Sequence, residues 1–150
     1  MCLGVAVPIH EIPETLIVQH RLADRIAQRD PGAGREIQFL WRHRQPVLAV
    51  NLDNQLRIVK WGNRGGGPLP AGGWCHREWI EAGLWQELRP QPAIIAAALA
   101  IDRGIWTLAN EGIKGVVVRD RVYMLTEPAT HYYRIMTRSN RMPVLVGQTI

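Results

Sequence analysis

Short apolar runs, rich in branched residues and bounded by turn residues, recur along most of this chain. Runs of this kind are typical of strands. The strands that we expect cover residues 3–9, 36–41, 47–52, 56–61, 105–109, 115–119, 121–126 and 142–146. The polar triplet 53–55 separates two of these runs and predicts a hairpin with a three-residue loop.

Helical spacing is confined to fewer segments. Apolar residues recur at helical intervals from Pro13 to about Arg29, and a short helix is expected over residues 79–88. Residues 127–137 form either a helix or a long loop, and the wholly apolar residues 93–101 form either a central strand or a short core helix. Many strands with two or three helices predict an α+β domain, mostly antiparallel, that spans residues 1–150.

A glycine-rich stretch interrupts the pattern between residues 62 and 73, with six Gly and two Pro. It contains neither a Walker pattern nor GxGxxG, which argues against a nucleotide-binding loop. We expect a surface loop or a loop beside the substrate.

Length and cysteine content narrow the class of protein. A chain of 150 residues predicts one domain that needs no disulfide. Its two cysteines form no CxxC pair, so neither a metal site nor a cofactor is expected. No apolar run approaches the roughly 20 residues of a membrane span, and no secretion signal is recognisable. We expect a cytoplasmic protein with reduced thiols.

The charge balance favours a polyanionic partner. The formal net charge is +5, and tryptophans alternate with basic residues in Trp41-Arg42-His43-Arg44 and Lys60-Trp61. Such interleaving suits base stacking and phosphate pairing on single-stranded DNA. Burial of the tryptophans in a small core is the alternative.

The candidate chemistry lies at Met1-Cys2. Removal of Met1 leaves a cysteine with a free α-amine and a thiol, and both have a reactive fraction near neutral pH. The amine forms a Schiff base with an aldehyde, and the thiol then closes a thiazolidine ring. A residue-2 cysteine also occurs by chance, so the position alone does not establish chemistry.

Several motifs occur in the order found in the SOS-response-associated peptidase (SRAP) family, which the chain resembles. In chain order they are Met1-Cys2, Trp61-Gly62, Cys75-His76-Arg77-Glu78, residues 101–108, Leu125-Thr126-Glu127-Pro128-Ala129 and Arg138-Ser139-Asn140-Arg141-Met142-Pro143-Val144. The resemblance is to a divergent, short and phage-related member.

The resemblance implies a barrel-like central sheet, a basic channel for single-stranded DNA and covalent capture of abasic sites by Cys2, with self-cleavage as a peptidase. The family's Asn, Glu and His fall at Cys75, Thr107 and Ser139. The catalytic candidates are therefore Cys2, Thr107 and Ser139. DNA ligands are expected at Arg77, Trp61, Arg138 and Arg141, and substitutes for the lost groups at Cys75, His76, Glu78 and His131.

Three hypotheses follow. The protein is a DNA-binding protein whose Cys2 still captures aldehydes, a degenerate SRAP-fold protein that binds DNA without chemistry, or an unrelated small basic protein of mobile-element origin. A retained Met1 excludes the thiazolidine. A cleft that joins Cys2, Arg77, Thr107 and Ser139 would separate the first two hypotheses from the third.

Overall fold

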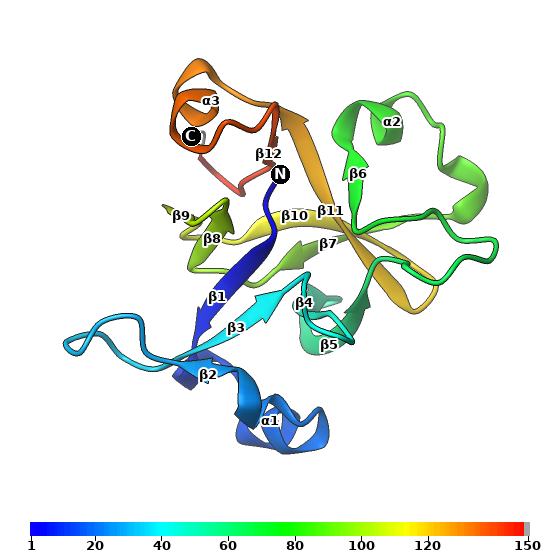
Figure 1. Ribbon diagram of the computed structural model, residues 1–150. Coiled ribbons are helices and arrows are strands. Elements are labelled where there is room, and N and C mark those ends of the chain that lie inside the picture. Colours follow the sequence, from blue (N-terminus) through cyan, green and yellow to red (C-terminus); the bar gives the residue numbers. More distant parts are fainter. Residues whose placement is uncertain (149–150) are drawn as a thin grey trace.

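Two sheets make up the computed structural model, which describes residues 1–148 (Figure 1). The first sheet is antiparallel throughout and has the strand order β2-β3-β1-β8-β9. Its strands are β1 (Gly4–Pro8), β2 (Ile26–Ala27), β3 (Glu36–Leu40), β8 (Leu99–Asp102) and β9 (Ile105–Leu108).

The second sheet closes into a five-stranded barrel. Its strands are β4 (Val47–Leu52), β5 (Gln55–Trp61), β7 (Gln91–Ile95), β10 (Ile113–Val118) and β11 (Arg121–Pro128). The order β10-β7-β4-β5-β11 closes because β11 also pairs with β10, and only the β5–β11 pair is parallel within this ring. Two short strands extend β11: the parallel β6 (Trp74–His76) and the antiparallel β12 (Arg141–Pro143). The expected α+β class with a barrel-like, mostly antiparallel sheet is confirmed, and the separate sheet was not anticipated.

The helices are shorter than the sequence predicted. Helix α1 covers only Glu14–Gln19, because Arg21 adopts a left-handed conformation (φ 55°) and starts the 3₁₀ turn η2 (Leu22–Arg25). The prediction of one helix to about residue 29 was therefore wrong in its second half. The expected helix over residues 79–88 is also interrupted. Gly83 has a positive φ (74°) and separates α2 (Arg77–Glu81) from the 3₁₀ turn η3 (Gln86–Leu88).

The segment 127–137 becomes a strand end followed by helix α3 (His131–Thr137). Thr130 caps this helix, since its Oγ1 accepts a hydrogen bond from the Tyr133 backbone N–H at 3.2 Å. A further 3₁₀ turn, η1, covers Ile9–Glu11. None of the helices within residues 1–148 is long and apolar enough to cross a membrane.

The apolar run 93–101 is neither one strand nor a helix. It supplies the end of β7, crosses between the sheets and starts β8. The crossing is fixed at both ends, because the Ala96 N–H donates to Ala49 of the barrel and the Ala98 N–H donates to Ala6 of the first sheet.

The β4–β5 hairpin has a two-residue turn instead of the expected three. Asp53 and Asn54 both have positive φ (52° and 62°), as a type I′ turn requires, and β5 therefore begins at Gln55.

One buried cluster joins both sheets and includes Cys2, Phe39, Leu48, Trp61 and Ile95. A second cluster, around Cys75, Trp85, Tyr123 and Leu125, packs outside the barrel. Figure 1 shows that the N-terminus lies beside β12 and near α3, so β1 delivers the start of the chain to residues from its far end.

Candidate functional site

The α-amine of Met1 is bound by two residues distant in sequence. Its nitrogen lies 3.0 Å from Asp102 Oδ2 and donates to Ser139 Oγ at 2.6 Å. Asp102 is 2% exposed, so this is a charged contact with a buried carboxylate. The α-amine of Met1 is therefore held by specific polar contacts with two residues.

Asp102 is the centre of a hydrogen-bond network, which we call the terminal site: the Met1 amine, Asp102, Tyr133, Thr137 and Ser139. Ser139 Oγ donates to Asp102 Oδ1 at 3.0 Å, and the Tyr133 hydroxyl donates to Oδ2 at 2.7 Å. Burial, and secondarily the hydrogen bond to Asp102, raises the pKa of Tyr133 above its usual range. Tyr133 therefore stays a neutral hydrogen-bond donor.

Three elements position these groups. Asp102 ends β8, and Tyr133 lies on the buried side of α3. Arg138 ends α3 in a left-handed conformation (φ 60°), which turns the chain so that Ser139 returns toward Asp102. Thr137 fixes this turn, because its Oγ1 donates to the Tyr133 carbonyl at 2.8 Å and accepts the Ser139 N–H at 3.2 Å.

Cys2 lies beside the terminal site but points into the core. It is 0% exposed, and its Sγ donates to the Gly4 carbonyl at 3.2 Å. Burial raises the pKa of the Cys2 thiol to about 12, and the Asp102 charge adds to the rise. The Trp74 Nε1–H donates to the Cys2 carbonyl at 2.9 Å and fixes its backbone. With Met1 in place, the Cys2 thiol is protonated and enclosed.

Replacing Asp102 by Ala should destabilise the protein strongly. The change leaves the buried Tyr133 and Ser139 hydroxyls without their acceptor, at a cost of about 1–3 kcal/mol for each, while the half-exposed Met1 amine can be solvated. Urea unfolding at neutral pH measures the loss. Asp102→Asn keeps the shape and an acceptor oxygen and should lose less than Asp102→Ala; equal midpoints for the wild type and Asp102→Ala would contradict the network.

Of the predicted catalytic residues, the structure brings Cys2 and Ser139 together. Thr107 lies close by on β9, where it lines a small cavity with Tyr133 and Thr137, but no hydrogen bond joins it to the terminal site among residues 1–148. Cys75 belongs to the separate cluster outside the barrel, where burial raises the pKa of its thiol to about 12. Among residues 1–148, no hydrogen bond joins Cys75 to the terminal site.

Among residues 1–148, none of the other predicted substitutes is hydrogen-bonded to the terminal site. Arg141 binds Glu78 with both terminal nitrogens (2.8 and 3.1 Å), and this pairing is the main reason why the pKa of Glu78 is lowered. His76 stacks on Trp79 with ring centroids 4.2 Å apart, and burial followed by the charge of Arg141 lowers its pKa. His131 is exposed at the start of α3.

The predicted DNA ligands fall into different environments. Arg77 pairs with Glu81 and Glu127, both at 3.4 Å. Arg138 is exposed next to the terminal site. Trp61 is 1% exposed, and its Nε1–H donates to the Gly73 carbonyl at 2.8 Å. The expectation that the Trp61 ring stacks on bases is corrected by this burial.

Asp102 and Tyr133 were missed by the sequence reasoning. The available signal was an acidic residue directly after the apolar run 93–101, because a carboxylate that ends a buried strand needs partners. The partners themselves lie more than thirty positions away in the sequence, at Tyr133 and Ser139.

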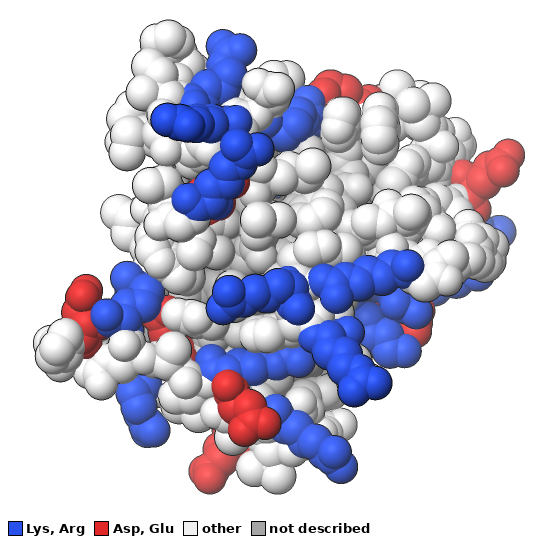
Figure 2. Space-filling view, in the orientation of Figure 1, with Lys and Arg blue, Asp and Glu red and all other residues white. Residues whose placement is uncertain are grey.

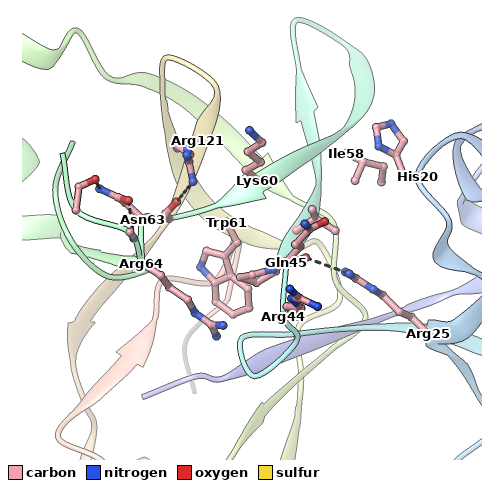
Figure 3. A pocket seen from close by; sticks show the side chains of 15 residues that line it. His20, Arg25, Arg44, Gln45, Ile58, Lys60, Trp61, Asn63, Arg64 and Arg121 are labelled. Carbon is pink, nitrogen blue, oxygen red and sulfur yellow. Dashed lines mark hydrogen bonds between the residues drawn. The ribbon is translucent and has the colours of Figure 1, made fainter. Parts of the chain in front are cut away.

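A basic groove of about 760 Å³ lies over strands β4 and β5 of the barrel, where it is also lined by Arg25 of η2, by the segment before β4 and by the loop after β5. Figure 3 shows that its labelled cationic side chains come from several separate segments around one space. They are Arg25, Arg44, Lys60, Arg64 and Arg121. Figure 2 shows Lys and Arg side chains in a band across this face of the molecule. None of the lining residues is acidic, although Asp120 pairs with Lys60 at 3.5 Å and with Arg121 at 3.4 Å.

Several groove arginines are held in place by the backbone. Arg25 Nη2 donates to the Gln45 carbonyl at 3.0 Å, while its Nη1 is buried without a partner among the described residues. Burial lowers the pKa of Arg25 from its ordinary value, and an anion in the groove would supply the missing acceptor. Arg64 donates to the His43 carbonyl at 2.9 Å and lies 4.3 Å from the centroid of the Trp41 ring.

These features define an α+β protein with a closed barrel, a second antiparallel sheet, a basic groove and a chain terminus bound to buried polar groups. No family model matches this chain, and neither does any curated protein or solved structure.

Proposed function

We propose that this is a SRAP-like single-stranded DNA-binding protein whose Cys2, once Met1 is removed, captures the aldehyde of an abasic site. The observation that carries the proposal is the basic groove, whose five cationic side chains are accompanied by no acidic lining residue. A single strand supplies the closely spaced phosphates that such a groove needs.

A tryptophan beside the groove, Trp41, favours a single strand over a duplex. Trp41 is half-buried, and Arg64 lies over its ring. Unpaired bases stack on such rings, whereas the bases of a duplex are already stacked on each other.

The chemical half of the proposal depends on the terminal site. Removal of Met1 moves the α-amine one residue along the chain, roughly 3.8 Å from the position that Asp102 and Ser139 now bind. The amine nitrogen attacks the aldehyde carbon, and loss of one water gives the Schiff base. The Cys2 sulfur then bonds to that carbon and its proton passes to the nitrogen, which completes the thiazolidine. In this proposal Asp102 takes and returns protons through Ser139, whose Oγ donates to it at 3.0 Å.

A second candidate is DNA binding without covalent chemistry. The burial of Cys2 favours it, because the thiol is enclosed and its pKa is about 12 while Met1 is present. In this alternative the terminal site is a structural anchor for the start of β1, and the groove alone carries the function.

Charge reversal at Arg44 tests the binding that both candidates share. Arg44 is an exposed groove residue, so Arg44→Glu replaces an attraction by a repulsion. We expect about ten- to thirtyfold weaker binding of a single-stranded oligonucleotide at low salt, and a salt slope shallower by about 0.7. Fluorescence anisotropy over a salt series measures both quantities.

Lys114→Glu is the matched control, since it changes the net charge equally on an exposed strand residue that lines a different hollow. It should bind nearly as the wild type does. Equal losses in the two variants would mean that net charge, and not the groove, sets the affinity; no salt-dependent binding by the wild type would overturn the proposed function.

A further inference from the structure

A second hollow, of about 290 Å³, lies between the groove and the terminal site. Its apolar walls are formed by Leu3, Leu40, Trp41, Ile101 and Trp106. Both tryptophans are partly exposed. The volume is that of a small flat ligand and far below that of a folded segment. We call this hollow the tryptophan pocket.

The rim of the tryptophan pocket is cationic. Arg42 and Arg103 line it and are exposed, and Arg29 lies 5.3 Å from the centroid of the Trp106 ring. Gln38 is the uncharged polar side chain on its wall, and no lining residue is acidic. The nearby Glu36 carboxylate is already paired with Arg29 at 2.8 Å. Apolar aromatic walls under a positive rim fit a ligand that combines a flat ring with a negative charge.

Trp41 joins this pocket to the groove. Arg64, a groove residue, covers the Trp41 ring, and Trp41 in turn lines the pocket. On the other side, Leu3 lines the pocket two residues from Met1, and Arg103 lines it directly after Asp102. The pocket therefore lies on a path from the groove to the chain terminus.

We propose that the tryptophan pocket binds one unpaired nucleobase of a single strand that occupies the groove, with the adjoining phosphate at Arg42 and Arg103. The inference rests on the proposed function and adds to it a defined base subsite. A flat base fills the apolar walls and contacts Trp41 and Trp106, while Gln38 is within the pocket to meet its polar edge. A duplex cannot offer an unpaired base without opening, so the pocket also gives preference for single strands.

The test compares two oligomers of about ten units, one of thymidylate and one of tetrahydrofuran spacers that keep the phosphates but lack bases. The wild type should bind the thymidylate oligomer more tightly than the spacer oligomer. Trp106→Ala should weaken thymidylate binding by about five- to a hundredfold and leave spacer binding unchanged. Trp106→Phe keeps a ring and should retain most of the preference.

Trp79→Ala is the control, because Trp79 is exposed and stacks on His76 on α2 instead of lining the pocket. It should bind both oligomers as the wild type does. Thermal unfolding establishes that the variants are folded, and the ratio of the two affinities in the wild type and in Trp106→Phe tests the pocket even where Trp106→Ala does not fold.

The outcomes separate the pocket from the function on which it rests. Tight, salt-dependent binding of both oligomers with equal affinity overturns the base subsite and leaves the groove standing. A thymidylate preference that survives in Trp106→Ala also overturns the subsite. No binding of either oligomer by the wild type overturns both the subsite and the proposed function.

Discussion

Protein that begins at Cys2 is expected to form a stable covalent adduct with a single-stranded oligonucleotide bearing one abasic site. The mass of the adduct should equal the sum of the two components less one water, because Schiff-base formation releases water and ring closure releases nothing. Intact mass spectrometry after incubation at neutral pH measures it. The free amine and thiol on one residue are what make the product stable.

Two variants isolate the chemistry. Cys2→Ala, with Met1 removed, keeps an α-amine but has no thiol, so it should form only a Schiff base that reverses unless it is reduced. Protein that retains Met1 has an amine on a residue without a thiol and should likewise give no thiazolidine. A stable adduct with either of these proteins would contradict the assignment of the chemistry to Cys2. If wild-type protein without Met1 forms no stable adduct, the function that remains is DNA binding without covalent chemistry.

Both cysteine thiols should react very slowly in the folded protein that retains Met1. The pKa of each is raised to about 12 by burial, whereas an unfolded cysteine has a pKa near 8.5. At pH 8 the thiolate fraction is therefore about a thousandfold smaller in the folded state. Alkylation by iodoacetamide, followed by mass, measures the rates with and without denaturant.

The pH dependence of the alkylation rate follows from the raised pKa of the two thiols. Because the folded pKa is raised, the folded rate should keep rising about tenfold per pH unit from pH 7 to 10, while the unfolded rate levels off above roughly pH 8.5. Cys75→Ser leaves Cys2 as the one thiol and assigns the rate to it. Rapid alkylation of folded Cys75→Ser would mean that Cys2 lies outside the core, and faster alkylation after Met1 removal would show that the first residue encloses the thiol.

The strands were largely predictable because each is a short branched run between turn residues. Residues 36–40 and 47–52 form strands close to where the pattern placed them. The helices were less predictable, because their ends depend on single residues in left-handed conformations. Arg21 and Gly83 end helical segments that the apolar spacing would have continued.

The run 93–101 illustrates a different limit. An apolar run signals burial on all sides, and both a strand and a helix can satisfy that signal. Here the run divides between two sheets, with Ala96 and Ala98 hydrogen-bonded to different ones. Only the packing of one sheet against the other decides such a division.

The sequence by itself determined the α+β class, most of the strands, the basic surplus and the position of a cysteine next to Met1, because these are properties of local pattern and composition. The tertiary structure alone decided which of the candidate site residues lie close together. It brought Ser139 and the unexpected Asp102 to the Met1 amine, enclosed Cys2 and Trp61 in the core, and packed Cys75 in a different hydrophobic cluster from Cys2. The reason is that a buried charge must find its partners in space, and strand pairing across the whole chain, not sequence spacing, sets which residues are near enough.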